Sequence, residues 1–334
     1  MHNKGKFVIS LDFELNWGVF DVLDFNQYKQ HLIGARKAVP VMLHRFKQHD
    51  IHATWGVVGF LFFSTKQELV KEVPQVQPQY EDSTLSSYRH IQKIGENEVE
   101  DPYHYGLSLI KQIKRIPHQE IATHTFSHYY CLAPGQDART FEADLVKAIQ
   151  IAKQHSISIK SLIFPRNQVN QAYLSICEDH GLISYRGCEA HWLYQIKSSV
   201  NGKVKRAIRL IDSYINLSGH HIYPVENRGQ EASLVNIPSS RFLRPYSKQF
   251  RFLEGLKLKR IKASMTRAAI EGKLYHLWWH PHNFGVHLEE NIQMLDHIIE
   301  HFHMLRHQYG MESLTMQEVS ERMASQLTNE TKII

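Results

Sequence analysis

Cysteine is scarce in this sequence: its 334 residues include only Cys131, Cys177 and Cys188. Their spacing matches no zinc-binding pattern, and an odd number argues against a framework of disulfides. We therefore expect reduced, buried thiols, which indicate a cytoplasmic compartment. No signal peptide precedes the first predicted strand, because MHNKGK leads directly into FVISLDFE, and this also predicts a cytoplasmic protein.

The sequence also lacks long apolar runs, internal repeats and low-complexity tracts. No stretch approaches the roughly 20 apolar residues that a transmembrane helix needs, so we expect no membrane span. The formal net charge is +6, but the basic residues are scattered, apart from LKLKRIK at 256–262. That run is typical of a solvated helix face, and we predict no nucleic-acid partner. The sequence does not constrain the oligomeric state.

What the sequence does contain is an alternation of short β-rich runs with segments of helical periodicity. The runs predict strands at 6–14, 51–58, 119–124, 160–165, 182–186, 233–238 and 274–280. Helices are predicted at 139–155, 171–180 and 254–271, and in a C-terminal region 287–327 at 287–309 and 315–327. This alternation is typical of parallel strands joined by right-handed crossovers. Seven strands favour a distorted (β/α)7-type barrel over an open sheet, in one domain spanning residues 1–334.

Two connections are longer than a crossover between parallel strands requires. Residues 65–104 are polar and interrupted by prolines, and we predict that they pass over the barrel mouth. Residues 187–232 include a helical stretch near 203–217 and then a loop rich in turn-forming residues. Long ordered loops in compact domains are more often functional than idle, so both are expected near the site.

Polar side chains stand where the predicted strands end. They are Asp12, Glu14, His124, His128, Arg166, Asn167, His280 and His282. In a parallel barrel all these strand ends lie on one face, where the loops surround a shared pocket. The sequence therefore predicts a functional site at the carboxyl ends of the strands.

His124 and His128 lie four residues apart in EIATHTFSHYY, directly after a predicted strand. If the turn that follows is helical, this spacing places both imidazoles on one face, where they can bind one divalent cation. Asp12 and Glu14 are two apart on one strand and point to the same side. One carboxylate would complete the metal site and the other would act as a general base. The alternative is a carboxylate pair neutralised by Arg166 or another basic residue.

Four segments, SLDFELNWG, THTFSH, FPRNQ and WWHPHNFG, occur in this order between residues 10 and 285. With them the sequence resembles the polysaccharide deacetylases, the NodB-homology family also called carbohydrate esterase family four. That family usually has two adjacent aspartates, then His-Ser/Thr-x-x-His, then Arg-x-Pro, and finally a leucine-rich segment with a histidine. HTFSH is a specific match and the other three segments are variants. No segment matches the family's fourth motif, whose place is taken by SSRFLRPYS at 239–247.

The resemblance implies that His124 and His128 bind one divalent metal ion, with Glu14 as carboxylate ligand and Asp12 as general base. The ion is expected to be zinc, although cobalt, nickel and iron(II) also suit such ligands. Because this chain has Asp-Phe-Glu where the family has Asp-Asp, Asp12 can instead be the ligand and Glu14 the base. His280 would protonate the leaving group.

The resemblance also implies that Arg166 orients the base, although the order here is Pro-Arg. Candidate substrate contacts are Trp17, Trp55, Tyr129, Asn167 and His282. Each of the three aromatic rings can either stack on a sugar or pack in the core. His282 can either contact the substrate or support its neighbours by hydrogen bonds.

The function that the resemblance implies is metal-dependent removal of an acetyl group from an N-acetylated sugar or saccharide precursor, during surface-polysaccharide assembly. Two alternatives stay open. One is an allantoinase-like hydrolase that cleaves another amide on the same fold. The other is a carbohydrate-binding relative without turnover.

Overall fold

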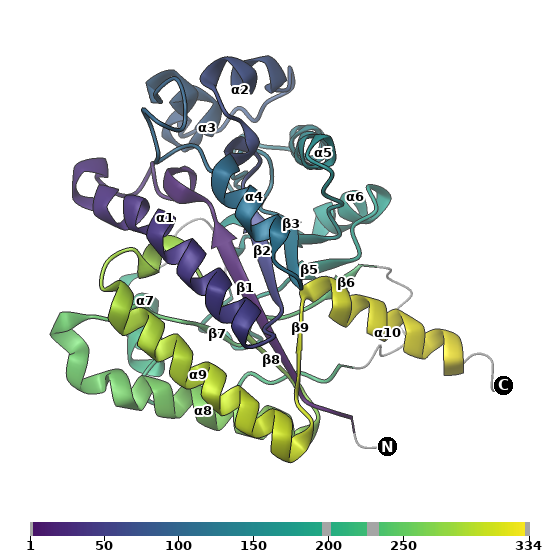
Figure 1. The fold of residues 1–334 in the computed structure, drawn as a ribbon. Helices are drawn as coiled ribbons and strands as arrows, with labels where there is room; N and C mark the ends of the chain where they lie inside the picture. Colours follow the sequence, from purple (N-terminus) through teal and green to yellow (C-terminus); the bar gives the residue numbers. More distant parts are fainter. Residues whose placement is uncertain (1–2, 196–201, 226–233, 331–334) are drawn as a thin grey trace.

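The computed structural model describes residues 3–195, 202–225 and 234–330, which form a curled parallel sheet surrounded by helices (Figure 1). The strands are β1 (Lys6–Phe13), β2 (Ala53–Val57), β3 (Gln119–Thr123), β4 (Ser161–Ile163), β5 (Ser184–Arg186), β6 (Val235–Asn236), β7 (Arg241–Phe242), β8 (Leu274–Trp279) and β9 (Glu312–Leu314). Their order is β6-β5-β4-β3-β2-β1-β8-β7. Strand β9 pairs with residues 6–8 of β1, below the stretch 9–13 that pairs with β2.

The predicted barrel of parallel strands is confirmed, in the form of a curled half-barrel. Each of the seven predicted ranges contains a strand, although residue 233 of the range 233–238 lies outside the described residues. Among the described residues the edge strands β6 and β7 do not pair with each other, so the sheet stays open between them. The strands β7 and β9, of two and three residues, were not predicted.

The side chains of β1 point alternately to the two faces of the sheet, and the faces differ in chemistry. One set enters the main hydrophobic core: Phe7, Ile9, Leu11 and Phe13. The other set faces the barrel interior, where Val8 packs in a small apolar cluster with Leu314 and Met316. Further along, Ser10 and then Asp12 are buried polar residues. The interior is therefore apolar near the amino ends of the strands and polar near their carboxyl ends, where the predicted site lies.

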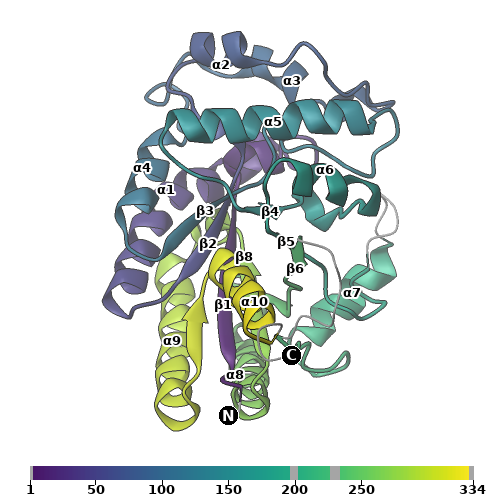
Figure 2. The ribbon, with the colours of Figure 1, turned by 90° about the vertical axis from the view of Figure 1, so that its right-hand side faces the viewer.

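Helices cover the sheet, and each predicted helical range contains a helix (Figures 1 and 2). Outside the two long connections they are α1 (Phe25–Gln48), α4 (Leu107–Arg115), α5 (Ala138–Gln154), α6 (Leu174–Asp179), α8 (Glu254–Glu271), α9 (Leu288–Tyr309) and α10 (Met316–Glu330). Of these, α1 and α4 were not predicted. Helix α9 ends at Gly310, whose φ of 68° suits a residue without a side chain. Among the helices that the structure describes, none combines the length and apolarity needed to cross a membrane.

The two long connections carry short helices. The first contains α2 (Lys66–Glu72) and α3 (Ser87–His90), and its last residues touch the chain just beyond β1: the Trp17 indole donates to the carbonyl of His104 at 2.8 Å. The second contains α7 (Lys203–Asp212) within the predicted stretch 203–217. Residues 196–201 and 226–232 of this second connection lie outside the described part of the chain.

Candidate metal centre and active site

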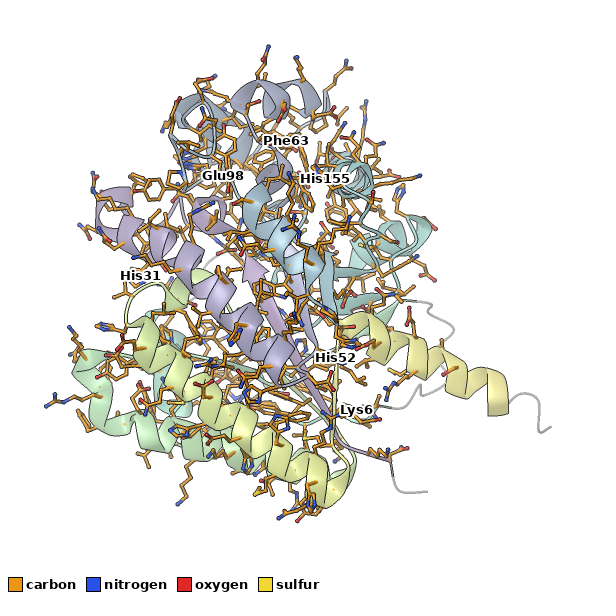
Figure 3. The ribbon with its side chains drawn as sticks, viewed as in Figure 1. Lys6, His31, His52, Phe63, Glu98 and His155 are labelled. Atoms are coloured by element: carbon orange, nitrogen blue, oxygen red, sulfur yellow. The ribbon has the colours of Figure 1, made fainter. Side chains whose placement is uncertain are left out.

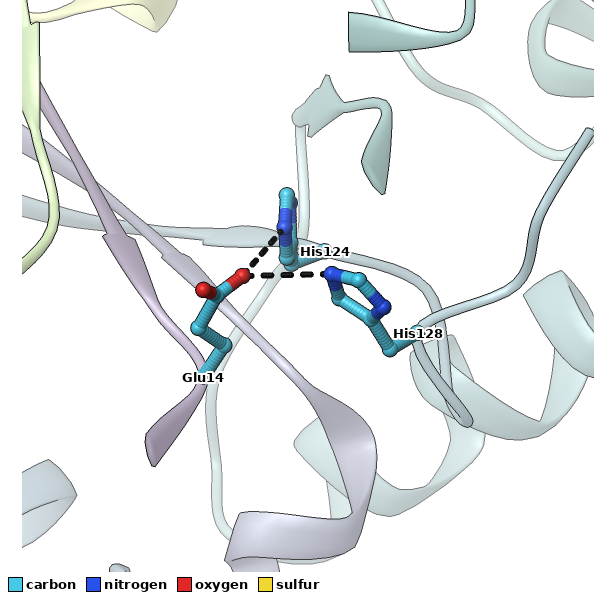
Figure 4. Close-up of side chains that lie close together, drawn as sticks. All are labelled: Glu14, His124 and His128. Carbon is cyan, nitrogen blue, oxygen red and sulfur yellow. Dashed lines mark hydrogen bonds and ion pairs between the residues drawn. The ribbon is translucent and has the colours of Figure 1, made fainter. Parts of the chain in front are cut away.

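The two histidines of HTFSH meet Glu14 at the carboxyl ends of β1 and β3 (Figure 4). Glu14 Oε2 lies 3.3 Å from His124 Nε2 and 3.1 Å from His128 Nε2, and all three side chains are buried. The helical turn expected after β3 is not formed. Instead Thr125 and His128 adopt left-handed backbone conformations, with φ of 62° and 58°. The ring centroids of His124 and His128 lie 5.1 Å apart.

A divalent metal ion fits these three groups. His124 donates from Nδ1 to the carbonyl of Ile163 at 2.8 Å, which leaves the lone pair of Nε2 facing the site. This buried Nε2 has no hydrogen-bond partner among the described residues. A buried nitrogen without a partner is costly, and a metal ion would satisfy it.

The protonation states in the site also suit metal binding. Burial alone would raise the pKa of Glu14, but the charge of His280 and the close contacts with His124 and His128 hold that pKa well below its usual value. Burial lowers the pKa of His128, although contact with Glu14 opposes the change. An ionised carboxylate beside a neutral imidazole is the form in which both groups bind metals.

Asp12 is bound by an arginine that the sequence analysis did not select. Arg186, at the end of β5, donates to both oxygens of Asp12 at 2.6 and 2.7 Å, and it also donates to Asn167 Oδ1 at 2.8 Å. Burial raises the pKa of Asp12, but Arg186 together with His124 and His280 outweighs this effect, and the net shift is downward. Asp12 is therefore ionised and held in one orientation, as a general base requires.

The prediction that Arg166 orients the base is wrong. Arg166 instead donates to both oxygens of Asp21 at 2.7 Å and lies over the ring of Tyr130 at 4.4 Å. Its backbone has a φ of 53° in the turn after β4, whereas Arg186 is the last residue of a regular strand with its side chain in the barrel interior. A basic residue inside a buried strand was the signal that could have identified Arg186.

His280 follows β8 and faces both carboxylates. Its Nε2 lies 3.5 Å from Glu14 Oε1 and 3.8 Å from Asp12 Oδ2, while Nδ1 donates to Asn283 Oδ1 at 3.1 Å. Asn283 thus holds one ring nitrogen and leaves Nε2 to exchange a proton. His282 stacks on His280 at 4.9 Å and is buried, and burial lowers its pKa to about 3, so it supports its neighbour as a neutral ring.

The aromatic rings predicted to contact a sugar lie elsewhere. Trp17, Trp55 and Tyr129 are each 0% exposed, and Trp55 donates from its indole to Gln119 Oε1 at 3.0 Å, beside the amino end of β3. A ring without exposed surface cannot stack on a ligand, so these three rings pack in the core. Trp278, next to the core residue Trp279 on β8, lines the cavity at the site, as do Phe242 and Tyr194.

A cavity of about 630 Å³ opens beside the candidate catalytic residues. Asp12 and His280 line one part of it, together with Asn167 and Trp278. Volumes of this size are typical of pockets that enclose a small organic ligand. A substrate in this cavity would therefore contact the base and the acid directly.

A second group that can hold a metal, Asp50, His52 and His118, lies at the opposite end of the sheet. His52 precedes β2 and lies near Lys6, the first residue of β1 (Figure 3). Asp50 and His118 are exposed, and Asp50 already pairs with Arg306 at 3.2 Å. This group is separate from the cavity, so His118 can be replaced without changing a residue that lines the cavity.

Comparisons with known proteins bear on the fold. No family model matches this sequence, and no curated protein matches it. A solved structure named as a polysaccharide deacetylase, from Mycobacterium smegmatis, matches with a TM-score of 0.60 and 15% identity, over 97% of this chain and 92% of that one. The fold is that of the polysaccharide deacetylases.

Two further structures support this fold. One, named as a polysaccharide deacetylase from Pseudomonas aeruginosa PAO1, matches with a TM-score of 0.56 and 11% identity, over 95% of this chain and 89% of that chain. The other, a Puue allantoinase, matches with a TM-score of 0.55 and 12% identity over the same shares. One fold thus occurs in proteins named for different hydrolytic reactions, and the reaction has to be argued from the site.

Proposed function

We propose that this protein is a metal-dependent hydrolase that removes an acetyl group from an N-acetylated sugar or saccharide precursor. One juxtaposition carries the proposal: Glu14, which forms one group with His124 and His128, lies 3.5 Å from His280 Nε2, and that nitrogen also faces Asp12 at 3.8 Å. Metal-assisted hydrolysis of an amide needs metal ligands, a base and an acid around one reacting centre.

The two histidine nitrogens and the Glu14 carboxylate would hold the ion, and we propose zinc. When bound, such an ion polarises the acetyl carbonyl and makes a water molecule easier to deprotonate. Because Arg186 occupies both oxygens of Asp12, the structure supports Glu14 as the ligand and Asp12 as the base, rather than the reverse.

The side chains of this site then divide the proton transfers. Asp12, ionised beside Arg186, accepts a proton from the attacking water. His280 donates a proton from Nε2 to the departing amine while Asn283 keeps its Nδ1 in place. Trp278, which lines the cavity beside His280, offers a face for the sugar ring.

We also propose that the substrate is a precursor of surface-polysaccharide assembly encountered in the cytoplasm. All three cysteines are free thiols, which suits a reducing compartment. The alternative, an allantoinase-like amide hydrolase, would use the same catalytic groups. An allantoinase has a similar fold, which supports this alternative. Assays on small ureides beside N-acetylated sugars separate the two reactions.

The test is metal content together with acetate release, in wild type, His124→Ala and the control His118→Ala. We expect about one bound metal and acetate release in wild type, both lost in His124→Ala and both kept in His118→Ala. Metal loss in His118→Ala alone would assign the ion to the other group. Acetate release by fully metal-stripped protein would disprove the proposed mechanism.

A further inference from the structure

One wall of the cavity beside Asp12 and His280 is rich in arginine. The arginines that line it are Arg166, Arg206, Arg209, Arg241 and Arg244. Two of them come from α7, and two from SSRFLRPYS at 239–247, the segment that stands in place of the family's fourth motif. Segments far apart in sequence therefore direct positive charge into one cavity.

Only part of this charge is neutralised within the protein. Arg166 pairs with Asp21 at 2.7 Å, and Arg241 pairs with Asp212 at 3.4 Å. Asp12, an acidic residue of the lining, is already paired with Arg186. In the described ranges of the chain, no carboxylate forms an ion pair with Arg206, Arg209 or Arg244.

The surroundings of Arg244 show the effect of this surplus. Arg244 is half-buried, burial lowers its pKa, and the neighbouring Arg209 and Arg241 lower it further. Glu189 also lines the cavity, but burial raises the pKa of its carboxyl, which weakens it as a counter-charge. Half-buried cations without a partner are unfavourable, and a bound anion would relieve the cost.

The apolar part of the lining contacts a catalytic group, because the rings of Trp278 and Phe242 both lie beside His280. Trp278 has its ring centroid 5.6 Å from that of His280 and 4.8 Å from that of Phe242. Phe242 lies two residues before Arg244 in the same segment. A ligand with a ring against Trp278 would therefore present a charged substituent toward Arg244.

We propose that this cavity binds the phosphate or diphosphate group of a saccharide, so that the substrate is a phosphate-linked N-acetylated sugar rather than a neutral polymer. This deepens, and rests on, the proposed function. Three unpaired guanidinium groups suit a group that carries more than one negative charge, because arginine donates two hydrogen bonds at once to phosphate oxygens.

The decisive experiment compares the binding of glucose 1-phosphate and glucose by calorimetry. Neither probe carries an acetyl group, so neither is consumed in the proposed reaction. We expect glucose 1-phosphate to bind at least about 10-fold more tightly than glucose. Arg244→Gln and Arg209→Gln should each weaken its binding by roughly 10-fold or more, and Arg206→Gln, at an exposed position where folding is not at risk, should act in the same direction.

Arg115→Gln is the matched control, because Arg115 is exposed at the end of α4, toward the amino ends of the strands. Equal affinities for the two probes, or an equal loss in Arg115→Gln, would overturn the inference. Competition by a nucleoside-diphosphate sugar or by a prenyl diphosphate would each support it, and the stronger competitor would identify the source of the phosphate.

Acetate release separates this inference from the proposed function. Arginine-dependent binding of glucose 1-phosphate without acetate release from any acetylated sugar phosphate would keep the anion site and remove the hydrolase. Acetate release that is equally fast from neutral acetylated sugars and from acetylated sugar phosphates, and that is unchanged for both in the three arginine variants, would keep the hydrolase and remove the anion site.

Discussion

Arg186 and Asp12 form a buried, two-pronged ion pair inside the half-barrel, with N–O distances of 2.6 and 2.7 Å. The guanidinium also lies over the ring of Trp278 at 4.3 Å, so the arginine is fixed on more than one side. Both oxygens of Asp12 accept hydrogen bonds from Arg186, whereas Glu14 Oε2 faces the nitrogens of His124 and His128, and this difference supports Glu14 as the proposed metal ligand. The ion pair also leads to the first prediction.

Replacing Arg186 with Gln removes the positive charge that lowers the pKa of Asp12. The pKa of Asp12 should rise, and the acidic limb of the kcat/KM–pH profile should move to higher pH. Loss of orientation should also lower kcat by about 100-fold. Since breaking a buried ion pair can cost about 3–5 kcal/mol, the kinetics are measured below the Tm of the variant. In Arg166→Gln, which breaks the pair with Asp21, the acidic limb should not move.

Asp12→Asn and Glu14→Gln should fail in different ways. Asp12→Asn should retain the metal and lose about 10²–10⁴-fold in kcat, because only the base is lost. Glu14→Gln should lose both the metal and the activity, because the only carboxylate ligand is replaced by an amide. Metal analysis beside steady-state kinetics checks both, and the opposite result would exchange the roles of the two residues.

Asp144 should make stability depend on pH. It is fully buried under the HTFSH turn, where Oδ1 accepts from the backbone N–H of Phe126 at 2.6 Å and Oδ2 accepts from the hydroxyl of Tyr88 at 2.8 Å. Burial raises its pKa from 3.8 to about 6, and hydrogen bonds only partly oppose this. The folded state then binds the proton more tightly than the unfolded state, so this group's contribution to stability falls as pH rises from about 4 to about 6.

The difference in unfolding free energy between wild type and Asp144→Asn should therefore change by about 3 kcal/mol over that range, to the disadvantage of wild type at the higher pH. Urea unfolding at several pH values measures this difference. A difference that is constant with pH would show that the carboxyl of Asp144 titrates normally.

Trp278 and Trp279 should respond differently to alanine. Trp279 is 0% exposed and stacks on Phe284 at 5.5 Å, so its removal should cost about 3–5 kcal/mol of unfolding free energy. Trp278 lines the cavity, so Trp278→Ala should mainly raise KM, by about 10-fold, through a lost stacking contact. Denaturant unfolding and kinetics of both variants check the contrast. Equal destabilisation with unchanged KM would place Trp278 in the core as well.

Much of the candidate site could be predicted from the sequence, because parallel strands carry their following residues to one edge. That rule alone places Asp12, Glu14, His124 and His280 together, and it also explains why the barrel was predicted correctly. The i,i+4 spacing of His124 and His128 predicted that their rings lie close together, and they do, but left-handed residues and not a helical turn bring them together.

The sequence by itself determined the alternation of strands and helices and the strand-end position of the reactive side chains, because both follow from local periodicity. Only the tertiary structure decided which arginine meets Asp12, since Arg166 lies in the turn after β4 and Arg186 ends β5, and the backbone directs their side chains to different partners. The same holds for the arginine wall, which joins α7 to residues 241–244 across the barrel mouth. Contacts between segments so far apart leave no local pattern, because they arise from how the sheet curls.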